Sequence, residues 1–384
     1  MTRLLVLELA VGLMAGVAGG AGLEIRAVNP LDTARSAETL ELPRSLLAPL
    51  GEKDLRRIHV KDAAGKEYLC QAIDTDGDDA PDLVIFQSDF APSETRQFTV
   101  FTGSKWIYTK EQFRAHGRFV RERCDDFAWE NDRIAHRMYG RALETWGPEP
   151  LTSSAVDVWS KRTSRLVIED WYLLDNYHSD AGEGADFYSA GTTRGLGGTG
   201  LWADGRLWVS RNFVQSRVLA NGPIRVEFEL TYEPFDVNGI SVAETKRIRL
   251  DAGRNLDHFE SRFEAFVRPG QTVPLTCAIG VRKANLEQKE LNAGAGWLAA
   301  WERMEKNAGG QGDAVIFDPK NFESQTEDKL NLLVLEKVPA DGRVSYDAGF
   351  CWDKAGPIKD AAAWKAYVEK TARELAAPVV VTAR

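Results

Sequence analysis

Polar and apolar side chains alternate along several short segments of the chain. Residues 225–232 are the clearest case. Because successive side chains of a strand point to opposite faces, this segment is predicted to be a half-buried antiparallel strand. Glu227 and Glu229 fall on its polar face. Its apolar face carries Val226, Phe228, Leu230 and Tyr232.

A second pair of strands is predicted immediately afterwards. Residues 251–255, Asp-Ala-Gly-Arg-Asn, are typical of a turn between two strands. Beyond the turn, Phe259, Ser261 and Phe263 share one face of the next strand. The other face carries His258, Glu260, Arg262 and Glu264. Further strands are predicted at residues 83–87, 97–102, 165–171, 314–317, 330–335 and 344–352.

One segment near the end of the chain has the period of a helix. Residues 360–376 carry an apolar stripe at Trp364, Val368, Thr371 and Leu375, with Asp360 as N-cap and Pro378 beyond the end. Many strands without alternating helices predict a mostly β protein, a large antiparallel β-sandwich with a C-terminal helix. We expect an N-terminal β region at residues 23–112 and the main sandwich domain at residues 113–384.

The first residues resemble a secretory signal. Arg3 precedes an apolar stretch that becomes rich in small residues, and cleavage is expected near Ala21 and Gly22, so residues 1–22 are the predicted signal peptide. Glu8 interrupts the apolar stretch, and an uncleaved membrane anchor is the alternative. No later segment is long and apolar enough to span a membrane. The mature chain is therefore expected to be soluble and exported.

The composition limits the classes of partner that the protein is expected to bind. The net charge is −9 and no run of Lys or Arg suggests a nucleic-acid surface. Many of the 11 tryptophans fall near the middle of the chain, where their rings either pack in a core or stack on sugar rings. The 4 cysteines are far apart and form no zinc motif, so disulfides and free buried thiols remain equal alternatives.

The segment 172–208 is the richest in candidate chemistry. It is glycine-rich, which is typical of a tightly folded functional loop. His178 is a candidate general base, Tyr188 a proton donor and Arg194 a group that neutralises a carboxylate. Together these groups suit β-elimination at C5 of a uronic acid. The acids of the loop, Asp180, Glu183 and Asp186, also permit a two-carboxylate hydrolase, and a loop held only by polar contacts is the third alternative.

Residues 122–140 form a second polar and aromatic segment. If residues 133–139 are a strand, Arg133, Arg137 and Tyr139 lie on one face and could bind a uronate carboxylate. Structural ion pairs with nearby acids are the alternative. His136, between Ile134 and Met138, fits a packed core histidine better than a ligand contact. The candidate substrate contacts are Arg133, Arg137, Tyr139, Glu183, Asp186 and Trp208.

An acidic loop suggests a cation site. Asp74, Asp76 and Asp78 alternate around Gly77, and such carboxylates can converge on Ca²⁺. Position 12 of the loop is Ile85, so this is not an EF-hand. An acidic turn before the strand at residues 83–87 is the alternative. Calcium is thus the one candidate cofactor, and the proposed chemistry requires none.

Longer motifs carry a family resemblance. The segments DTDGDDAPDLVIFQ, RFVRERCDDFAWENDRIAHRMYG, YHSDAGEGADFYSAGTTRGLGGTGLW and ETKRIRLDAGRNLDHFES resemble the bacterial family called domain of unknown function 4861, over nearly the whole mature chain. That family is similar to galactose-mutarotase-like supersandwich proteins and occurs in polysaccharide-degrading systems. The resemblance implies an exported carbohydrate-active protein, periplasmic or secreted. It supplies no catalytic residues.

These observations favour a protein that acts on uronate-containing oligo- or polysaccharides, with β-elimination as the first hypothesis. A glycoside hydrolase that uses Glu183 or Asp186 with another carboxylate is the second. A non-catalytic sugar-binding protein is the third. The pattern favours no particular oligomeric state.

Overall fold

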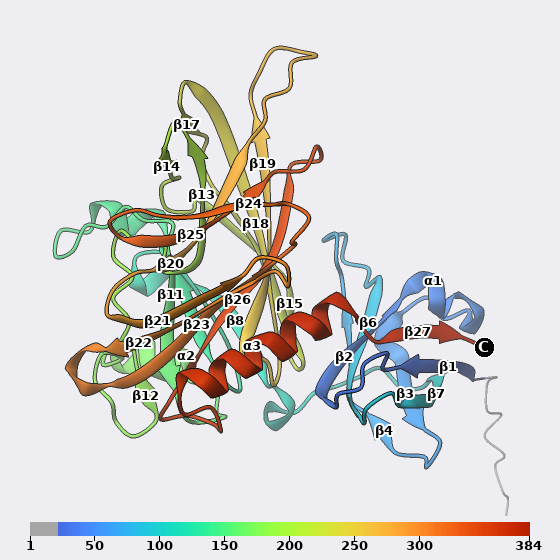
Figure 1. Cartoon of the computed structure of the whole chain (residues 1–384). Coiled ribbons are helices and arrows are strands. Elements are labelled where there is room, and N and C mark those ends of the chain that lie inside the picture. The colour runs from blue at the N-terminus through green and yellow to red at the C-terminus, as the bar shows by residue number, and fades with distance from the viewer. Residues whose placement is uncertain (1–21) are drawn as a thin grey trace, which may run out of the picture.

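The computed structural model describes residues 22–384 and consists of two β units joined by the C-terminal helix (Figure 1). All but the last residue of the predicted signal peptide lie outside the described residues. Within residues 22–384, no helix is both long and apolar enough to cross a membrane. The sheets are antiparallel, which confirms the mostly β sandwich with a C-terminal helix.

The smaller unit holds two sheets around its own apolar core. The five-stranded sheet has the order β27-β1-β7-β3-β4 and the three-stranded sheet the order β2-β6-β5. Apolar residues alternate inward along β1, where Leu23, Ile25 and Ala27 are buried. The strands are β1 (Leu23–Val28), β2 (Arg35–Pro43), β3 (Ile58–Asp62), β4 (Glu67–Tyr68), β5 (Cys70–Ile73), β6 (Leu83–Phe90), β7 (Thr95–Thr102) and β27 (Val380–Ala383), and the short helix α1 is Arg44–Leu47.

The larger unit is built on a nine-stranded sheet whose main path is β15-β16-β18-β19-β26-β23-β22-β21, with β17 paired to β18. The alternation seen at residues 225–232 arises because one face of β16 packs inward. The strands are β15 (Gln215–Asn221), β16 (Arg225–Thr231), β17 (Phe235–Val237), β18 (Ile240–Asp251), β19 (Leu256–Ala265), β21 (Leu286–Asn292), β22 (Trp297–Met304), β23 (Gly309–Phe317) and β26 (Arg343–Trp352).

Two five-stranded sheets share the core with this large sheet. Phe127, Phe228, Val281 and Val334, from all three sheets, belong to one buried cluster. The first sheet runs β12 (Gly184–Ala185), β11 (Val156–Lys161), β10 (Ala135–Met138), β9 (Asp126–Asn131) and β8 (Ala115–Val120). The second runs β14 (Arg206–Trp208), β13 (Leu196–Ala203), β20 (Thr276–Arg282), β25 (Asn331–Lys337) and β24 (Phe322–Glu327).

The C-terminal helix is as expected, but the last strand changes the division of the chain. Helix α3 (Ala361–Ala376) begins after Asp360, whose carboxylate accepts a hydrogen bond from the Ala363 N–H at 2.8 Å. Trp364 and Val368 pack the helix against the large sheet. The chain then returns to the smaller unit, where β27 pairs with β1. The predicted main domain, residues 113–384, therefore differs from the structure at its end.

The strand predicted at residues 165–171 is wrong, because helix α2 (Ile168–Leu174) begins within it. The buried carboxylate of Glu130 accepts hydrogen bonds from the N–H groups of Val167 and Ile168, each at 2.7 Å. Its other oxygen lies 2.6 Å from Lys161 Nζ. These contacts satisfy the first N–H groups of the helix, which have no partner within it.

Candidate functional site

A polar cleft of about 340 Å³ opens between β9, β10 and β11 and the glycine-rich segment. Its floor carries charged side chains from the strands, and its wall is formed by residues 186–191. The predicted site residues that line it are Arg137, Tyr139, His178, Asp186 and Tyr188. The other members of the lining that matter chemically are Arg123, Asp126, Glu149, Asp157 and Glu305.

Arg137 occupies the centre of the cleft floor. Its Nε lies 2.8 Å from Asp157 Oδ2, and its Nη2 lies 3.0 Å from Asp186 Oδ2. Asp126 Oδ2 is 3.9 Å from Nη1. Tyr139 donates its O–H to Asp157 Oδ2 at 2.9 Å. Arg137 is thus surrounded by carboxylates of the protein and holds the cluster together.

Two of the carboxyl groups near Arg137, those of Asp126 and Asp186, have raised pKa values. Burial raises the pKa of Asp126 to about 7, and the Arg137 guanidinium opposes this shift. Burial, followed by repulsion from Asp157, also raises the pKa of Asp186 well above its usual range. A charged carboxylate loses its water shell on burial, which favours the protonated form. Near neutral pH the cluster therefore holds carboxyl protons that could be transferred.

His178 is the exposed histidine of the cleft, whose lining also holds the exposed acids Glu149 and Glu305. Its side chain is 62 % exposed, and its Nδ1 lies 3.5 Å from Asp186 Oδ2. Partial desolvation, and then the nearby Arg137 cation, lower the pKa of the imidazole. At neutral pH the ring is therefore mostly uncharged and can accept a proton. The structure leaves this imidazole open to solvent beside a buried carboxylate.

Arg123 was missed by the sequence analysis. It closes the short 3-10 turn Arg121–Arg123, and its guanidinium carbon lies 4.5 Å from the Trp146 ring centre. Its Nε donates to the Tyr177 hydroxyl at 2.5 Å. The nearest carboxylate, Glu149, is 4.0 Å away and 73 % exposed. Arg123 is therefore the cleft arginine best placed to bind an external carboxylate.

Asp157 was also missed, although the sequence holds a signal for it. The residue lies on β11 between Val156 and Val158, and all three are buried. A lone aspartate within an apolar strand has to be paired or hydrogen-bonded. Its partner, Arg137, is on the adjacent strand and in direct register.

Tyr188 lines the cleft from a buried position. Its hydroxyl has no hydrogen-bond partner within the described part of the chain. The guanidinium carbon of Arg282 lies 3.7 Å from the ring centre, and Arg282 also donates to the Ser189 carbonyl at 2.9 Å. Burial, and then Asp313, raise the pKa of Tyr188. The phenol thus keeps its proton across the physiological range.

Arg194 is not brought to the cleft. Its side chain is 2 % exposed and donates to Ser154 Oγ at 2.9 Å and to the Thr199 carbonyl at 3.2 Å. Burial lowers its pKa to about 10. Gly280 makes room for it, since a Cβ at that position would lie 2.3 Å from Arg194 Cβ. The position does not fit the predicted role, because no ligand in the cleft could reach the guanidinium.

Three predicted substrate contacts also lie outside the cleft. Arg133 donates to Asn255 Oδ1 at 2.9 Å and lines a separate cavity of about 220 Å³. Glu183 is paired with Arg165, at 2.5 Å. Trp208 packs under the Arg206 guanidinium, 3.6 Å from the ring centre. The structure does not place these residues with His178.

The acidic loop and the remaining candidates have structural partners. Asp74, Asp76 and Asp78 each offer an oxygen within 4.8 Å of the others. The Asp74 carboxylate also accepts the Gly77 N–H at 2.6 Å, so it shapes the loop without a cation. Calcium binding stays a prediction.

His136 is a buried core residue, 2.9 Å from Asp257. Free thiols are found at Cys70, Cys124, Cys277 and Cys351.

The sequence of the chain has relatives among known proteins. A family model described as a domain of unknown function, DUF4861, matches residues 28–381. A protein of Formosa agariphila described as "Uncharacterized protein P7" is 30% identical over 371 residues, which cover 92% of this chain and 91% of that protein.

Two solved structures from Enterococcus faecalis share the fold. One is described as a protein in the glycosyl hydrolase family 38, with a TM-score of 0.53 and 10% identity over 94% of this chain and 47% of that one. The other is described as an alpha-mannosidase, with a TM-score of 0.51 and 9% identity over 94% of this chain and 46% of that one. The chain spans about half the length of each. At this identity the likeness concerns the fold alone.

Proposed function

The chain belongs to the DUF4861 family, and from that premise we propose that it is a carbohydrate-active protein that cleaves uronate-containing saccharides by β-elimination. The cleft beside His178 is the proposed active site. The names of the two solved structures, a glycosyl hydrolase family 38 protein and an alpha-mannosidase, support a saccharide ligand.

One observation carries the choice of reaction. The exposed imidazole of His178 has a lowered pKa and is neutral at pH 7, and it lies 3.5 Å from the Asp186 carboxyl group and close to two arginines. A carboxyl group beside the imidazole can orient the ring, and the neutral ring can accept a proton. A base of this kind matches abstraction of the C5 proton of a uronate.

The reaction then follows in balanced steps. Arg123 binds the substrate carboxylate and takes the role first expected of Arg194. His178 removes the proton from C5, and the electron pair of that C–H bond forms the C4–C5 double bond. The bond from C4 to the glycosidic oxygen breaks, and the leaving oxygen takes a proton from water, because the Tyr188 hydroxyl first expected in this role is buried. The products are an unsaturated uronate and a shortened saccharide.

The experiment is a panel of uronate polysaccharides and oligosaccharides, followed by ultraviolet absorbance and by release of reducing ends. The conjugated double bond of the product absorbs in the ultraviolet, whereas the substrate does not. We expect both signals to rise together on at least one member of the panel. Reducing ends without absorbance would replace elimination with hydrolysis, and binding without either signal would indicate a sugar-binding protein.

Hydrolysis is the second candidate because the cleft contains carboxyl groups that stay protonated. Asp126 has a pKa of about 7, and that of Asp186 is also raised. A glycosidase needs one protonated and one ionised carboxyl group around the scissile bond. Both side chains are at most 3 % exposed, however, which places them behind His178 rather than against a substrate. That burial favours elimination as the first proposal.

We also propose that the protein is exported to the periplasm or secreted. The support is the predicted signal peptide at residues 1–22. Expression in a bacterial host, followed by N-terminal sequencing of the extracytoplasmic fraction, tests this. A new N-terminus near residue 22 is expected. An intact N-terminus in the cytoplasmic fraction would contradict export.

A further inference from the structure

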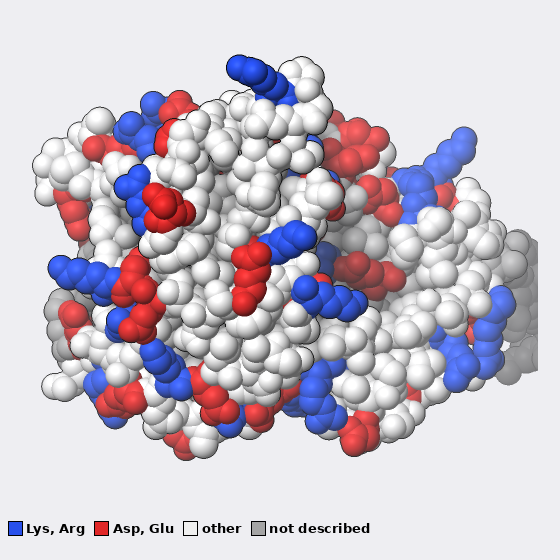
Figure 2. Space-filling model, turned by 45° about the horizontal axis from the view of Figure 1, so that its top comes forward, with Lys and Arg blue, Asp and Glu red and all other residues white. Residues whose placement is uncertain are grey.

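A second and larger cavity lies where the two β units meet. It measures about 590 Å³, a size typical of small-molecule and oligosaccharide sites. Strand β2 forms one wall, strands β16, β18, β19 and β26 form the floor, and α3 lies above. Figure 2 shows a hollow between the larger and the smaller body, with acidic side chains on its walls. This groove shares no lining residue with the cleft at His178.

The groove continues along the large sheet. A neighbouring cavity of about 260 Å³ shares Glu41, Arg225, Arg249 and His258 with it. These four side chains therefore lie at the junction of a longer channel. The two adjoining cavities together offer room for several linked sugar units.

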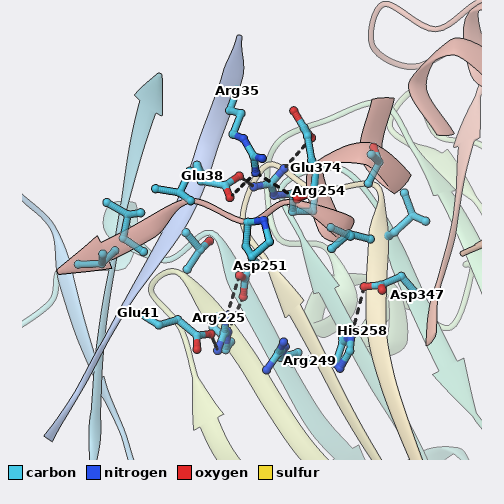
Figure 3. Close-up of a pocket in the computed structure, with 18 of the residues that line it drawn as sticks. Arg35, Glu38, Glu41, Arg225, Arg249, Asp251, Arg254, His258, Asp347 and Glu374 are labelled. Carbon is cyan, nitrogen blue, oxygen red and sulfur yellow. Dashed lines mark hydrogen bonds and ion pairs between the residues drawn. The ribbon is translucent and has the colours of Figure 1, made fainter. Parts of the chain in front are cut away.

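Most charges in the groove neutralise one another. Arg225 forms two hydrogen bonds with Asp251, at 2.6 and 2.9 Å, and lies 2.8 Å from Glu41. Arg254 lies 2.7 Å from Glu38. The pairs made by Glu41 and Glu38 cross between the units, since both acids are on β2 (Figure 3). They stabilise the interface and are not free to bind a ligand.

Arg249 is the exception. It is half-buried on β18, and its side chain forms no hydrogen bond or ion pair with any residue in the described range 22–384. Figure 3 shows it at the floor of the groove without a dashed contact. Its neighbours in register are Glu227 and His258. Glu227 is already paired with Arg247, at 2.7 Å.

His258 extends the same surface. Its Nδ1 lies 3.3 Å from Asp347 Oδ1, so its other ring nitrogen is available to a ligand. The ring and the Arg249 guanidinium come from paired positions on adjacent strands. A partly buried guanidinium that forms no ion pair, beside an imidazole and inside a concave site, favours an oxyanion. Tyr367 from α3 adds an aromatic side chain to the lining.

We propose that the groove is a second saccharide site, in which Arg249 binds the carboxylate or sulfate group of an acidic sugar unit. The saccharide nature of the ligand rests on the proposed function, but the preference for an oxyanion does not. An acidic polysaccharide held in the groove would be bound away from the cleft. Arg249 then raises affinity for the polymer and leaves the turnover of short substrates unchanged.

The first test uses inorganic sulfate with three proteins: wild type, Arg249→Ala and the control Arg262→Ala. Arg262 carries the same charge on β19 but is exposed and does not line the groove. We expect sulfate to raise the melting temperature of wild type and of Arg262→Ala above the rise given by chloride at equal ionic strength. Arg249→Ala should lose this difference. An equal sulfate effect on all three proteins would overturn the role of Arg249.

The second test measures affinity by calorimetry for a long oligouronate, a sulfated neutral oligosaccharide and the unsulfated form. Arg249→Ala should weaken binding of one acidic ligand at least fivefold, and Arg262→Ala should not. The ligand affected identifies a carboxylate or a sulfate. If Arg249→Ala binds all three ligands as wild type does, the groove proposal fails. The elimination assay on short substrates tests the cleft independently of the groove. The groove proposal and the proposed function can therefore fail separately.

Discussion

The Nδ1 atom of His178 lies 3.5 Å from the Oδ2 atom of Asp186, and that same oxygen lies 3.0 Å from Nη2 of Arg137. One carboxylate thus lies next to both the exposed imidazole and the buried guanidinium. The arginine keeps part of the negative charge in place, while burial raises the pKa of Asp186. The proposed base therefore depends on the buried cluster behind it.

Loss of Arg137 should destabilise the fold strongly. Arg137→Ala would leave Asp157 and Asp186 buried without their cation, and removing one partner of a buried ion pair costs about 3–5 kcal/mol. Arg165→Ala is the control, because Arg165 pairs with Glu183 at the surface and should cost about 0–1 kcal/mol. Urea unfolding of both variants measures the difference. Equal losses would contradict the central role of Arg137 in the cluster.

The stability of the protein should fall as pH rises through neutrality. The pKa of Asp126 is raised from 3.8 to about 7, so the native state binds a proton that the unfolded state has already lost. The contribution is full below the unfolded pKa and disappears as pH passes the folded pKa. Asp126→Asn removes it, and its melting temperature should change less than that of wild type between about pH 5 and about pH 8. Identical pH profiles for the two proteins would show that Asp126 does not hold this proton.

Arg123 should affect substrate affinity more than the chemical step. Arg123→Ala removes a charged hydrogen-bond donor that contributes about 1.5–3 kcal/mol, so we expect KM to rise by about one to two orders of magnitude. Lysine at this position should recover only part of the loss, because it cannot bind a carboxylate in bidentate fashion. Arg121→Ala is the matched control, since Arg121 belongs to the same short turn but does not line the cleft. Steady-state kinetics in which both alanine variants have the same KM would exclude Arg123 as the carboxylate ligand.

The rate of elimination should rise with pH and level off in the acid range. His178 acts as base only when neutral, and its pKa is lowered below the ordinary value of 6.5. The value of kcat/KM should therefore increase as pH rises through a pKa below 6.5 and stay constant above it. Ultraviolet assays across the pH range give this profile. A rise that begins only above neutral pH would point to a different base.

The fold could be predicted from the sequence where one face of an element is buried. Residues 225–232 alternate because one face of β16 packs on the core, and residues 360–376 carry a stripe because α3 packs on the sheet. The strand prediction for residues 165–171 was wrong because a tertiary contact determines their structure. Their apolar run is compatible with a strand or a helix. The helix forms here because the Glu130 carboxylate, on β9, accepts hydrogen bonds from the N–H groups at the start of α2.

The cleft could be predicted only in part. The sequence identified three residues of the cleft, His178, Asp186 and Tyr188. Polar and aromatic side chains in a glycine-rich segment are typical of a functional loop. Arg194 lies in the same segment but faces the interior, because the chain enters β13 two residues later. Its direction depends on the register with β20, where Gly280 leaves space for the side chain. Sequence spacing carries no information about that register.

The most direct measurement of the central claim is kcat/KM of His178→Ala on an oligouronate, followed by ultraviolet absorbance. His116→Ala is the control, because His116 is also a partly exposed histidine next to a carboxylate, Glu169, but lies outside the cleft. Loss of a general base should lower kcat/KM by about 10²–10⁴-fold in His178→Ala, with substrate affinity retained and His116→Ala unaffected. Equal kcat/KM in His178→Ala and wild type would contradict the assignment of His178 as the base.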